Sequence, residues 1–366
     1  MQHSETSPLE TSIDSRPVKL TCKDLWKVFG SNAKNVLNSA KGGTRSDIIN
    51  EIRSARHIPA VSDVSFDVHE GEIFVLMGLS GSGKSTVLRC LSSLIEPTSG
   101  KIVFEGRNLL DLNRKEMIDV RRHKMGMVFQ SFGLLPHLSV LENVAFPLKI
   151  QGVGSAERLK RAKEFVELVG LKGREHAMPD ELSGGQQQRV GIARSLAVGP
   201  DLWFLDEPFS ALDPLIRRQM QDEFVRLQSK LNKTIIFVTH DFLEALKIAD
   251  RIAIMKDGQV VQIGTPAEIV LQPVNNYVSE FTSDVPLIRV LKASDVMQQS
   301  ETANGVLDVE PHTVLEDILD IHDFNDGDVV VKDSDGNIRG VVTANSVMSV
   351  MHGGIARIRH ADTAGL

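Results

Sequence analysis

Residues 73–86 have the sequence IFVLMGLSGSGKST, in which a strand-length apolar run leads into a glycine-rich loop and then into a helical pattern. The segment GLSGSGKS at 78–85 matches the pattern G-x-x-x-x-G-K-[ST] of phosphate-binding loops. Glycines let the backbone approach phosphate without Cβ clashes, and the N–H groups at the start of the helix face the anion. A glycine-rich turn before an ordinary helix would not require a lysine and a serine at these positions. The segment therefore predicts a nucleotide-binding α/β domain.

This loop supplies most of the predicted nucleotide-binding residues. Lys84 would reach the β- and γ-phosphates, and Ser85 would hold Mg²⁺. The ATP-binding residues that we predict in this segment are Gly78, Leu79, Ser80, Gly81, Ser82, Gly83, Lys84, Ser85 and Thr86.

A second apolar run, LWFLDE at 202–207, ends in two carboxylates. Alone, such a run usually marks a strand that meets solvent, but downstream of a phosphate-binding loop it indicates a hydrolytic site. Asp206 would bind Mg²⁺ directly or through water, and Glu207 would polarise the attacking water.

The composition favours a protein of a reducing compartment without a nucleic-acid partner. The formal net charge is −7, so bulk electrostatics do not favour binding to nucleic acid. Cys22 and Cys90 form neither a disulfide framework nor a metal-binding pattern. The N-terminus lacks the apolar core of a signal peptide, and the apolar runs are too short to span a membrane. A function at a membrane would therefore require a partner.

Charge and polarity divide the chain into segments. Residues 1–17 are polar and are expected to be disordered. Residues 18–283 form the expected α/β domain, and residues 31–58 within it have the polar, basic character of an insertion. Residues 284–366 contain 6 Lys/Arg against 14 Asp/Glu, whereas the rest of the chain is nearly neutral. This change of charge predicts a domain boundary at residue 284.

Three local patterns give testable expectations. Ser46 is the expected N-cap of a helix in the insertion, because apolar residues follow it at helical spacing. The runs 65–68 and 73–77 are expected to pair as strands on either side of a tight turn. Helical patterns in 132–180 are expected to be broken by Pro136, Pro147 and Gly154.

The segment LSGGQQQR at 182–189 resembles the signature of the ABC transporter ATPase family. Alone, the serine would be an ordinary helix N-cap. The resemblance implies that Ser183, Gly184, Gly185 and Gln186, with the helix dipole, contact the γ-phosphate of ATP held by the opposite subunit. It therefore implies a homodimer of ATPase subunits.

Further family elements follow in the expected order. Gln130, in VFQSF, resembles the glutamine that senses Mg²⁺ and water, so that Ser85, Gln130 and Asp206 are the implied Mg²⁺ ligands. His240, in FVTHD, resembles the histidine that contacts the γ-phosphate and orients Glu207. The implied catalytic group is therefore Glu207, His240 and Gln130.

Two more elements of this resemblance lie outside the phosphate-binding loop. The segment SALD is similar to the D-loop, which crosses the dimer interface and comprises Ser210, Ala211, Leu212 and Asp213. Phe29, in LWKVFG, is similar to the aromatic residue that stacks on adenine, which is often tyrosine in the family.

The resemblance covers about residues 18–283 and implies the fold and the partners. The implied fold class is α/β: an ABC-type P-loop ATPase with a RecA-like core and a helical subdomain at approximately 131–190. The implied activity is ATP hydrolysis with Mg²⁺ as cofactor. The implied partners are membrane-spanning permease subunits, which would place the chain peripherally at the cytoplasmic face of the inner (plasma) membrane.

Within that family, three segments are similar to the import ATPases for glycine betaine, proline betaine and choline: the insertion 31–58, the loop region 77–100 and the run SALDPLIRRQMQDEFVRLQ. Pro208 departs from this class, whose close members often have alanine there. The resemblance implies uptake of an osmoprotectant with a substrate-binding protein, and leaves related methylated amines such as carnitine or trimethylamine N-oxide open. The alternatives are an ABC importer for another small solute and a soluble, non-transport ABC ATPase.

The acidic tail, 284–366, alternates helix and strand patterns and resembles a single CBS motif, a small α+β domain. One motif per chain implies pairing across a dimer, or a remnant. Ser346 occupies the position of that family's ribose-binding aspartate, which argues against an adenosine ligand. The resemblance implies a regulatory tail.

Overall fold

Strand β3 (Ile73–Met77), which leads to the glycine-rich loop, lies inside a six-stranded sheet of the computed structural model. The structure describes residues 16–40, 42–300, 305–333 and 335–351, so most of the predicted disordered segment 1–17 lies outside the described residues. Packing divides the chain into two compact units, 1–263 and 264–366. Each unit is described by itself below.

The six-stranded sheet of the first unit has the order β10-β9-β3-β8-β7-β6. Strands β3, β7 and β8 are buried along their whole length, as expected for parallel strands covered on both faces. The other strands of this sheet are β6 (Met125–Val128), β7 (Leu202–Asp206), β8 (Thr234–Thr239), β9 (Arg251–Lys256) and β10 (Gln259–Gly264).

A second, antiparallel sheet has the order β2-β1-β4-β5. Its strands are β1 (Val18–Phe29), β2 (Ile58–His69), β4 (Ser99–Phe104) and β5 (Arg107–Asn108). The expectation that 65–68 and 73–77 pair with each other was wrong, because β2 pairs with β1 while β3 pairs with β8 and β9. The chain changes sheet at this turn, and the Phe66 and Phe74 rings stack across the two sheets with centroids 4.7 Å apart.

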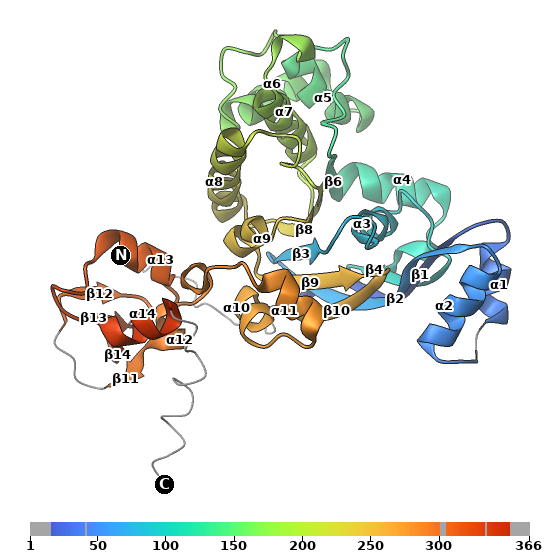
Figure 1. The fold of residues 1–366 in the computed structure, drawn as a ribbon. Helices are drawn as coiled ribbons and strands as arrows, with labels where there is room; N and C mark the ends of the chain where they lie inside the picture. Colours follow the sequence, from blue (N-terminus) through green and yellow to red (C-terminus); the bar gives the residue numbers. More distant parts are fainter. Residues whose placement is uncertain (1–15, 41, 301–304, 334, 352–366) are drawn as a thin grey trace, which may run out of the picture. The chain divides into compact units, whose positions relative to one another are not determined.

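Helix α3 (Lys84–Leu91) follows the glycine-rich loop and packs into the core that both sheets share. Helix α4 (Arg114–His123) precedes β6, and α8 (Pro214–Leu231) and α9 (Phe242–Ile248) follow β7 and β8. The alternation of buried strands and amphipathic helices confirms the α/β prediction (Figure 1).

A helical group consists of α5 (Val140–Ile150), α6 (Ser155–Leu168) and α7 (Gly184–Ala197), which pack on one another (Figure 1). The predicted break at Pro147 was wrong, since this residue lies inside α5. Proline removes one backbone donor. The helix is retained because a capping box of Ser139 and Glu142 closes its start, and because Val144 and Leu148 are buried.

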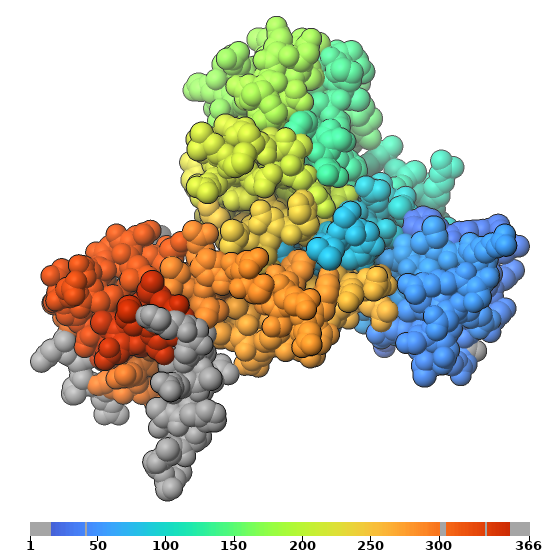
Figure 2. All heavy atoms as spheres, in the orientation of Figure 1, coloured from blue at the N-terminus to red at the C-terminus, as the bar shows by residue number. Residues whose placement is uncertain are grey.

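The insertion forms a helical hairpin of α1 (Ala33–Ser39) and α2 (Arg45–Ser54), seen in blue in Figure 2. Leu37 and Ile52 pack with Trp26 of β1 in a small separate core. The N-cap of α2 is Thr44 and not Ser46. Thr44 forms a capping box with Asp47 in which each side chain accepts a hydrogen bond from the other residue's backbone N–H.

In the second unit, α10 (Pro266–Leu271) and α11 (Asn276–Thr282) precede a sheet of order β11-β14-β13-β12. The unit begins earlier than the change of charge at residue 284, because Leu271 packs against the core of this unit. Its other elements are α12 (Ala293–Val296), β11 (Gln298–Gln299), β12 (Leu307–Val309), α13 (Leu315–Ile321), β13 (Val329–Lys332), β14 (Ile338–Val342) and α14 (Ala344–Met351). The alternation of helix and strand is confirmed, whereas the CBS-like character stays a prediction.

Among the described residues, no helix combines the length and the apolar character needed to cross a membrane.

His57 joins the two ends of the insertion. Its Nδ1 lies 2.7 Å from the carbonyl oxygen of Ala55, and its Nε2 lies 2.6 Å from that of Ser31. Because carbonyls only accept, both contacts are hydrogen bonds only when the ring is doubly protonated. These two carbonyls raise the pKa of His57.

A pH-dependent stability follows from this contact. Since the pKa is higher in the folded state, the stabilisation is complete below the unfolded value of about 6.5 and is lost as pH rises through the folded value. In thermal unfolding, we expect His57→Asn to lower Tm clearly at about pH 5.5 and little at about pH 8.5. The exposed His137, replaced by asparagine, is the control. An equal loss of Tm at both pH values would contradict the assignment.

Candidate functional site

The loop between β3 and α3 is held by close backbone contacts. A Cβ atom at Gly78 would lie 2.2 Å from the carbonyl oxygen of Met255, and one at Gly83 would lie 2.4 Å from that of Ala60. Both glycines have positive φ, at 148° and 99°. The loop therefore needs glycine at these positions for space and for backbone conformation.

Lys84 begins α3 and is only 5% exposed. Its Nζ donates to the carbonyl oxygens of Gly78, at 2.9 Å, and Leu79, at 3.1 Å. Burial lowers the pKa of Lys84, and the carboxylates of Glu207 and Asp206 oppose this shift. A buried ammonium held by neutral carbonyls gains from an anionic partner in the cavity.

Asp206 is the last residue of β7 and is 3% exposed. Its Oδ1 accepts a hydrogen bond from Ser85 Oγ at 2.7 Å, and its Oδ2 lies 3.3 Å from Nη2 of Arg89. Residues far apart in sequence meet here because β3 and β7 flank β8, so that their carboxyl ends open on the same edge of the sheet.

Glu207 follows directly in a left-handed conformation, with φ 46°. This conformation costs a non-glycine residue about 1–2 kcal/mol. It is held by the hydrogen bond from the Glu207 N–H to the Val238 carbonyl, at 3.0 Å. Oε2 of Glu207 lies 3.1 Å from Nδ1 of His240, the residue after β8. The carboxylate is thus turned toward the cavity and paired with the histidine.

These side chains surround one cavity of about 510 Å³. Its lining combines the Lys84 ammonium, serine and threonine hydroxyls, the Gln130 amide and the Glu207 carboxylate, which suits a polyphosphate with a divalent cation. The residues that line the cavity are Ala60, Leu79, Ser80, Gly81, Gly83, Lys84, Ser85, Thr86, Gln130, Glu207 and His240. Asp206 does not line the cavity, but it accepts a hydrogen bond from Ser85, which does. Gly78 and Ser82 belong to the loop without lining the cavity.

The segment 183–186 lies elsewhere, at the start of α7. Ser183 Oγ accepts from the N–H of Gln186 at 3.3 Å, and the Gln186 side chain accepts from the Ser183 N–H at 3.0 Å. Ser183 and Gly184 are exposed, Gly185 is buried, and none of the four lines the cavity. Within one chain, the predicted signature and the phosphate-binding loop are therefore not brought together.

The D-loop segment 210–213 connects Glu207 to α8. Ser210 Oγ donates to the Glu207 carbonyl at 2.9 Å, and Asp213 caps α8 by accepting from the N–H of Ile216. Leu212 is buried and Ala211 is exposed.

Phe29, at the end of β1, is 41% exposed and does not line the cavity. Nζ of Lys27 lies 5.0 Å from the centre of its ring. The ring face is therefore occupied by a cation within the chain, and the adenine-stacking role stays a prediction.

Comparison with known proteins identifies the family. The family model described as ABC transporter matches residues 61–210. The chain is 54% identical over 335 residues to the trimethylamine N-oxide transport system ATP-binding protein TmoW of Pelagibacter ubique, over 91% of this chain and 97% of that one. The chain belongs to the ABC transporter family of ATP-binding proteins.

Other members of this family are also similar. The ABC ATPase is 48% identical over 305 residues to the glycine betaine transport ATP-binding protein OpuAA of Bacillus subtilis, over 83% of this chain and 72% of that one. A solved structure, the dimeric post-hydrolysis state of the ATP-binding cassette MJ0796 with ADP and Pi, matches with TM-score 0.56 and 34% identity. The match covers 68% of this chain and 98% of that one.

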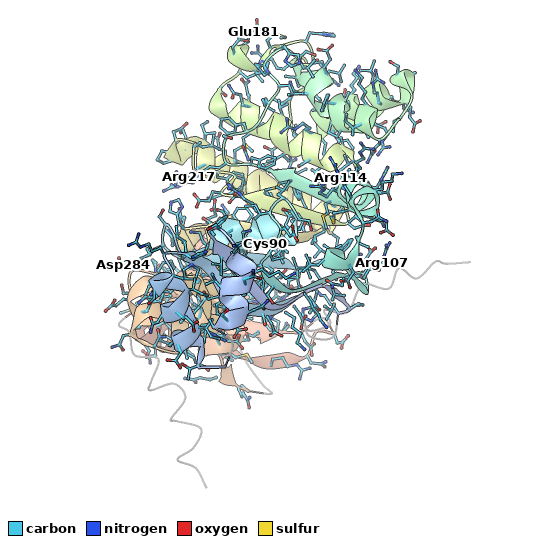
Figure 3. All side chains as sticks on the ribbon, turned by 90° about the vertical axis from the view of Figure 1, so that its right-hand side faces the viewer. Cys90, Arg107, Arg114, Glu181, Arg217 and Asp284 are labelled. Atoms are coloured by element: carbon cyan, nitrogen blue, oxygen red, sulfur yellow. The ribbon has the colours of Figure 1, made fainter. Side chains whose placement is uncertain are left out.

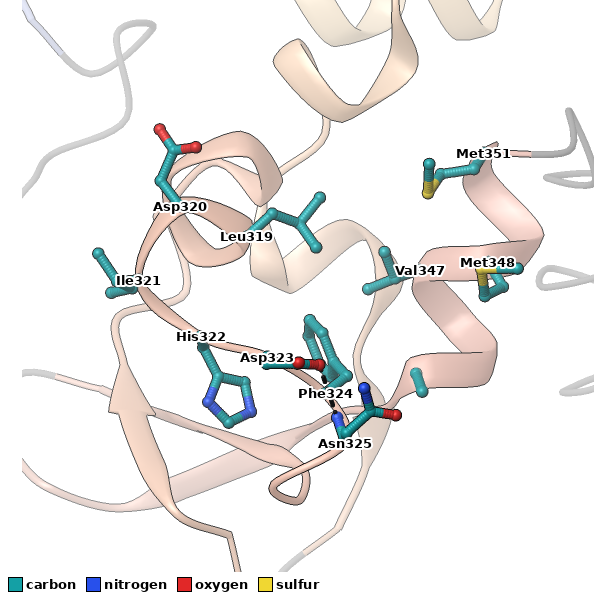
Figure 4. Close-up of a pocket in the computed structure, with 11 residues that line it drawn as sticks. Leu319, Asp320, Ile321, His322, Asp323, Phe324, Asn325, Val347, Met348 and Met351 are labelled. Atoms are coloured by element: carbon teal, nitrogen blue, oxygen red, sulfur yellow. Dashed lines mark hydrogen bonds between the residues drawn. The ribbon is translucent and has the colours of Figure 1, made fainter.

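Two features of the ABC ATPase could not be found from its motifs. Ala60 lines the nucleotide cavity from β2, outside every motif, and its carbonyl is what excludes a side chain at Gly83. A separate cavity of about 720 Å³ lies in the second unit between α13 and α14, where Leu319, Phe324 and Met351 face it (Figure 4). None of the predicted nucleotide-site residues lines this second cavity.

The glycines of the loop give a matched pair of variants. Gly81 has φ 81° with open space around a built Cβ, whereas a Cβ at Gly83 would overlap the Ala60 carbonyl. We expect Gly81→Ala to lower the free energy of unfolding by about 1 kcal/mol, for the left-handed conformation alone. Gly83→Ala should cost more and should also weaken ATP binding, because the loop must move. Urea unfolding and calorimetric ATP titration measure both effects, and equal losses for the two variants would contradict this account.

Proposed function

We propose that this chain is the ATP-hydrolysing subunit of an importer for a small methylated amine, with trimethylamine N-oxide and glycine betaine as the candidate solutes. The observation that carries the proposal is the similarity along nearly the whole chain to TmoW, whose name assigns it to trimethylamine N-oxide transport. ATP-binding proteins named for glycine betaine, carnitine, proline betaine and choline transport are similar as well. The geometry of the cavity supports the hydrolytic part of the proposal.

In the proposed reaction, each group of the cavity acts on the terminal phosphate or on water. Lys84 would bind the β- and γ-phosphates in place of the loop carbonyls that it now contacts. Glu207 would polarise the attacking water. His240, 3.1 Å from this carboxylate, would orient it and contact the γ-phosphate. Such positioning and electrostatic stabilisation are the main contributions of proteins to phosphoryl transfer.

The donor set at the cavity fits Mg²⁺ as the cofactor. Ser85 Oγ and Asp206 Oδ1 lie 2.7 Å apart, and Gln130 lines the same cavity. All three offer oxygen atoms, the ligands that Mg²⁺ prefers. The described residues contain no cluster of three or more His, Cys, Asp and Glu that could hold a metal. Phosphate and water would therefore supply the remaining ligands, and Mg²⁺ would neutralise charge on the phosphates.

The exposed start of α7 supports the proposed homodimer. Ser183 and Gly184 are exposed, so the positive end of the α7 dipole faces solvent. A two-fold symmetric dimer would set this helix start against the partner's cavity, and the reverse contact would follow by symmetry. Each ATP would then be held between two chains, with segment 210–213 at the interface.

A groove beside β6 and α5, in the first unit, supports the proposed contact with a permease. It has a volume of about 390 Å³. Phe146 and Ile150 on its rim are partly exposed apolar side chains, and Arg122 and Arg194 line it as well. An apolar groove of this kind fits a short amphipathic helix. Gln130 lines the nucleotide cavity and its neighbour Phe129 lines this groove, so a link between the two through this segment is part of the proposal.

The remaining assignments follow from this proposal. A substrate-binding protein would deliver the solute to the permease, and the ATPase would lie peripherally at the cytoplasmic face of the inner membrane. The second unit would act as a CBS-like regulatory tail.

In that unit Ser346 is buried. Its hydroxyl donates to the carbonyl oxygen of Thr343 at 2.9 Å, so the hydroxyl proton is used in a hydrogen bond within the turn.

Uptake tests the proposal. In cells that lack osmolyte uptake and express this chain with its permease and substrate-binding protein, we expect growth at high osmolarity to be rescued by trimethylamine N-oxide or glycine betaine. Glu207→Gln should abolish rescue while the purified variant still binds ATP, because only the group that polarises water is lost. Rescue by neither solute, with the complex present in the membrane, would contradict the solute class. Rescue by the Glu207→Gln variant would contradict the role of this residue.

A further inference from the structure

Arg217 lies in the first turn of α8 and is labelled in Figure 3. Its guanidinium contacts the loop that connects Glu207 to this helix. Nε lies 3.3 Å from the carbonyl oxygen of Phe209, and Nη2 lies 3.2 Å from that of Leu212 and 3.5 Å from that of Ser210. One side chain therefore binds three carbonyls of a four-residue stretch. The loop is therefore hydrogen-bonded to a side chain of the helix that follows it.

The same guanidinium also reaches the histidine loop. Nη1 of Arg217 lies 3.7 Å from Oδ2 of Asp241. Asp241 follows His240 directly and caps α9, because its Oδ1 accepts from the N–H of Glu244 at 3.2 Å. The backbone beside His240 is thus held by α9 on one side and by Arg217 on the other.

A second polar contact joins the two helices one turn further along α8. Nε2 of Gln221 donates to Oε1 of Glu244 at 3.1 Å, and both side chains are buried. Residues 217 and 221 are four apart and therefore lie on one face of α8. A small cavity between these contacts is lined by Glu207, Phe209, Ser210, Arg217, Thr239, His240, Asp241 and Glu244. Residues of both helices therefore border the same small cavity as Glu207 and His240.

We propose that Arg217 is a positioning residue for ATP hydrolysis, which fixes the loop after Glu207 and the loop of His240 relative to each other. Arginine suits this task because its planar fork offers five donors and a permanent charge, whereas lysine offers one compact ammonium. Without the fork, Glu207 and His240 still lie close together, but their geometry toward the γ-phosphate is no longer fixed. The inference rests on the roles proposed above for Glu207 and His240.

Steady-state kinetics of the purified full-length chain test this inference. Arg217→Lys keeps the charge and most of the stem, so the fold should be retained. We expect its kcat to fall about 10- to 100-fold, as for a small misplacement of reacting groups, with KM for ATP within about twofold of wild type. Arg218→Lys is the matched control, because Arg218 is the exposed neighbour on α8. This variant should keep the wild-type kcat.

A double-mutant cycle tests whether Arg217 affects kcat through its contact with Asp241. Asp241→Asn should also lower kcat with KM little changed, and the double variant Arg217→Lys with Asp241→Asn should be no slower than the worse single variant. Tm of each variant separates positioning from folding: a lowered kcat at unchanged Tm supports the inference. Wild-type kcat in a folded Arg217→Lys protein would overturn it. Turnover by Glu207→Gln would instead contradict the proposed function, so the two failures are distinguishable.

Discussion

The buried ammonium of Lys84 beside two carboxylates is the constraint on which the nucleotide site depends. Burial lowers the pKa of this lysine, while Asp206 and Glu207 favour its charged form. These charges meet because three neighbouring parallel strands end at one edge of the sheet, with β8 between β3 and β7. The glycine loop then closes over the lysine and supplies the carbonyls that it binds. A polyphosphate would compensate the positive charge of Lys84, and a divalent cation would compensate the negative charges of Asp206 and Glu207. The site therefore suits ATP with a divalent cation.

In the proposed dimer each nucleotide site takes groups from two chains, because the fold separates these groups within one chain. Lys84 and Glu207 come from the sheet, whereas the exposed start of α7 belongs to the helical group and does not line the cavity. In the proposed dimer, the exposed start of α7, which favours anions, faces the phosphate-binding cavity of the partner chain. With two-fold symmetry, each chain would supply both a cavity and a helix start. Hydrolysis would then require dimerisation, and any contact that moves the helical group would change the rate.

Short contiguous motifs could be predicted from the sequence, because their chemistry requires particular residue types at fixed spacing. The glycine loop with Lys84, the strand that ends in Asp206 and Glu207, and the helix cap at Ser183 are all visible as short patterns. What depends on tertiary packing was missed: β2 and β3 have the pattern of a hairpin but belong to different sheets. Arg217 gives no local signal either, since it is one arginine on an amphipathic helix. The helix start at Thr44 was detectable, because threonine with an acid three residues later is a capping box.

Mixing two inactive variants tests the central claim most directly. One variant, Lys84→Ala, lacks the lysine that would bind phosphate but has an intact α7 start. The other variant, Ser183→Arg, has an intact phosphate-binding loop but a blocked α7 start. If each ATP lies between two chains, the mixed dimer of these variants contains one fully intact site, and measured ATP hydrolysis reappears on mixing although each variant alone is inactive. If the mixture stays inactive while mixed dimers are shown to form, the site is not shared between chains and the account is wrong.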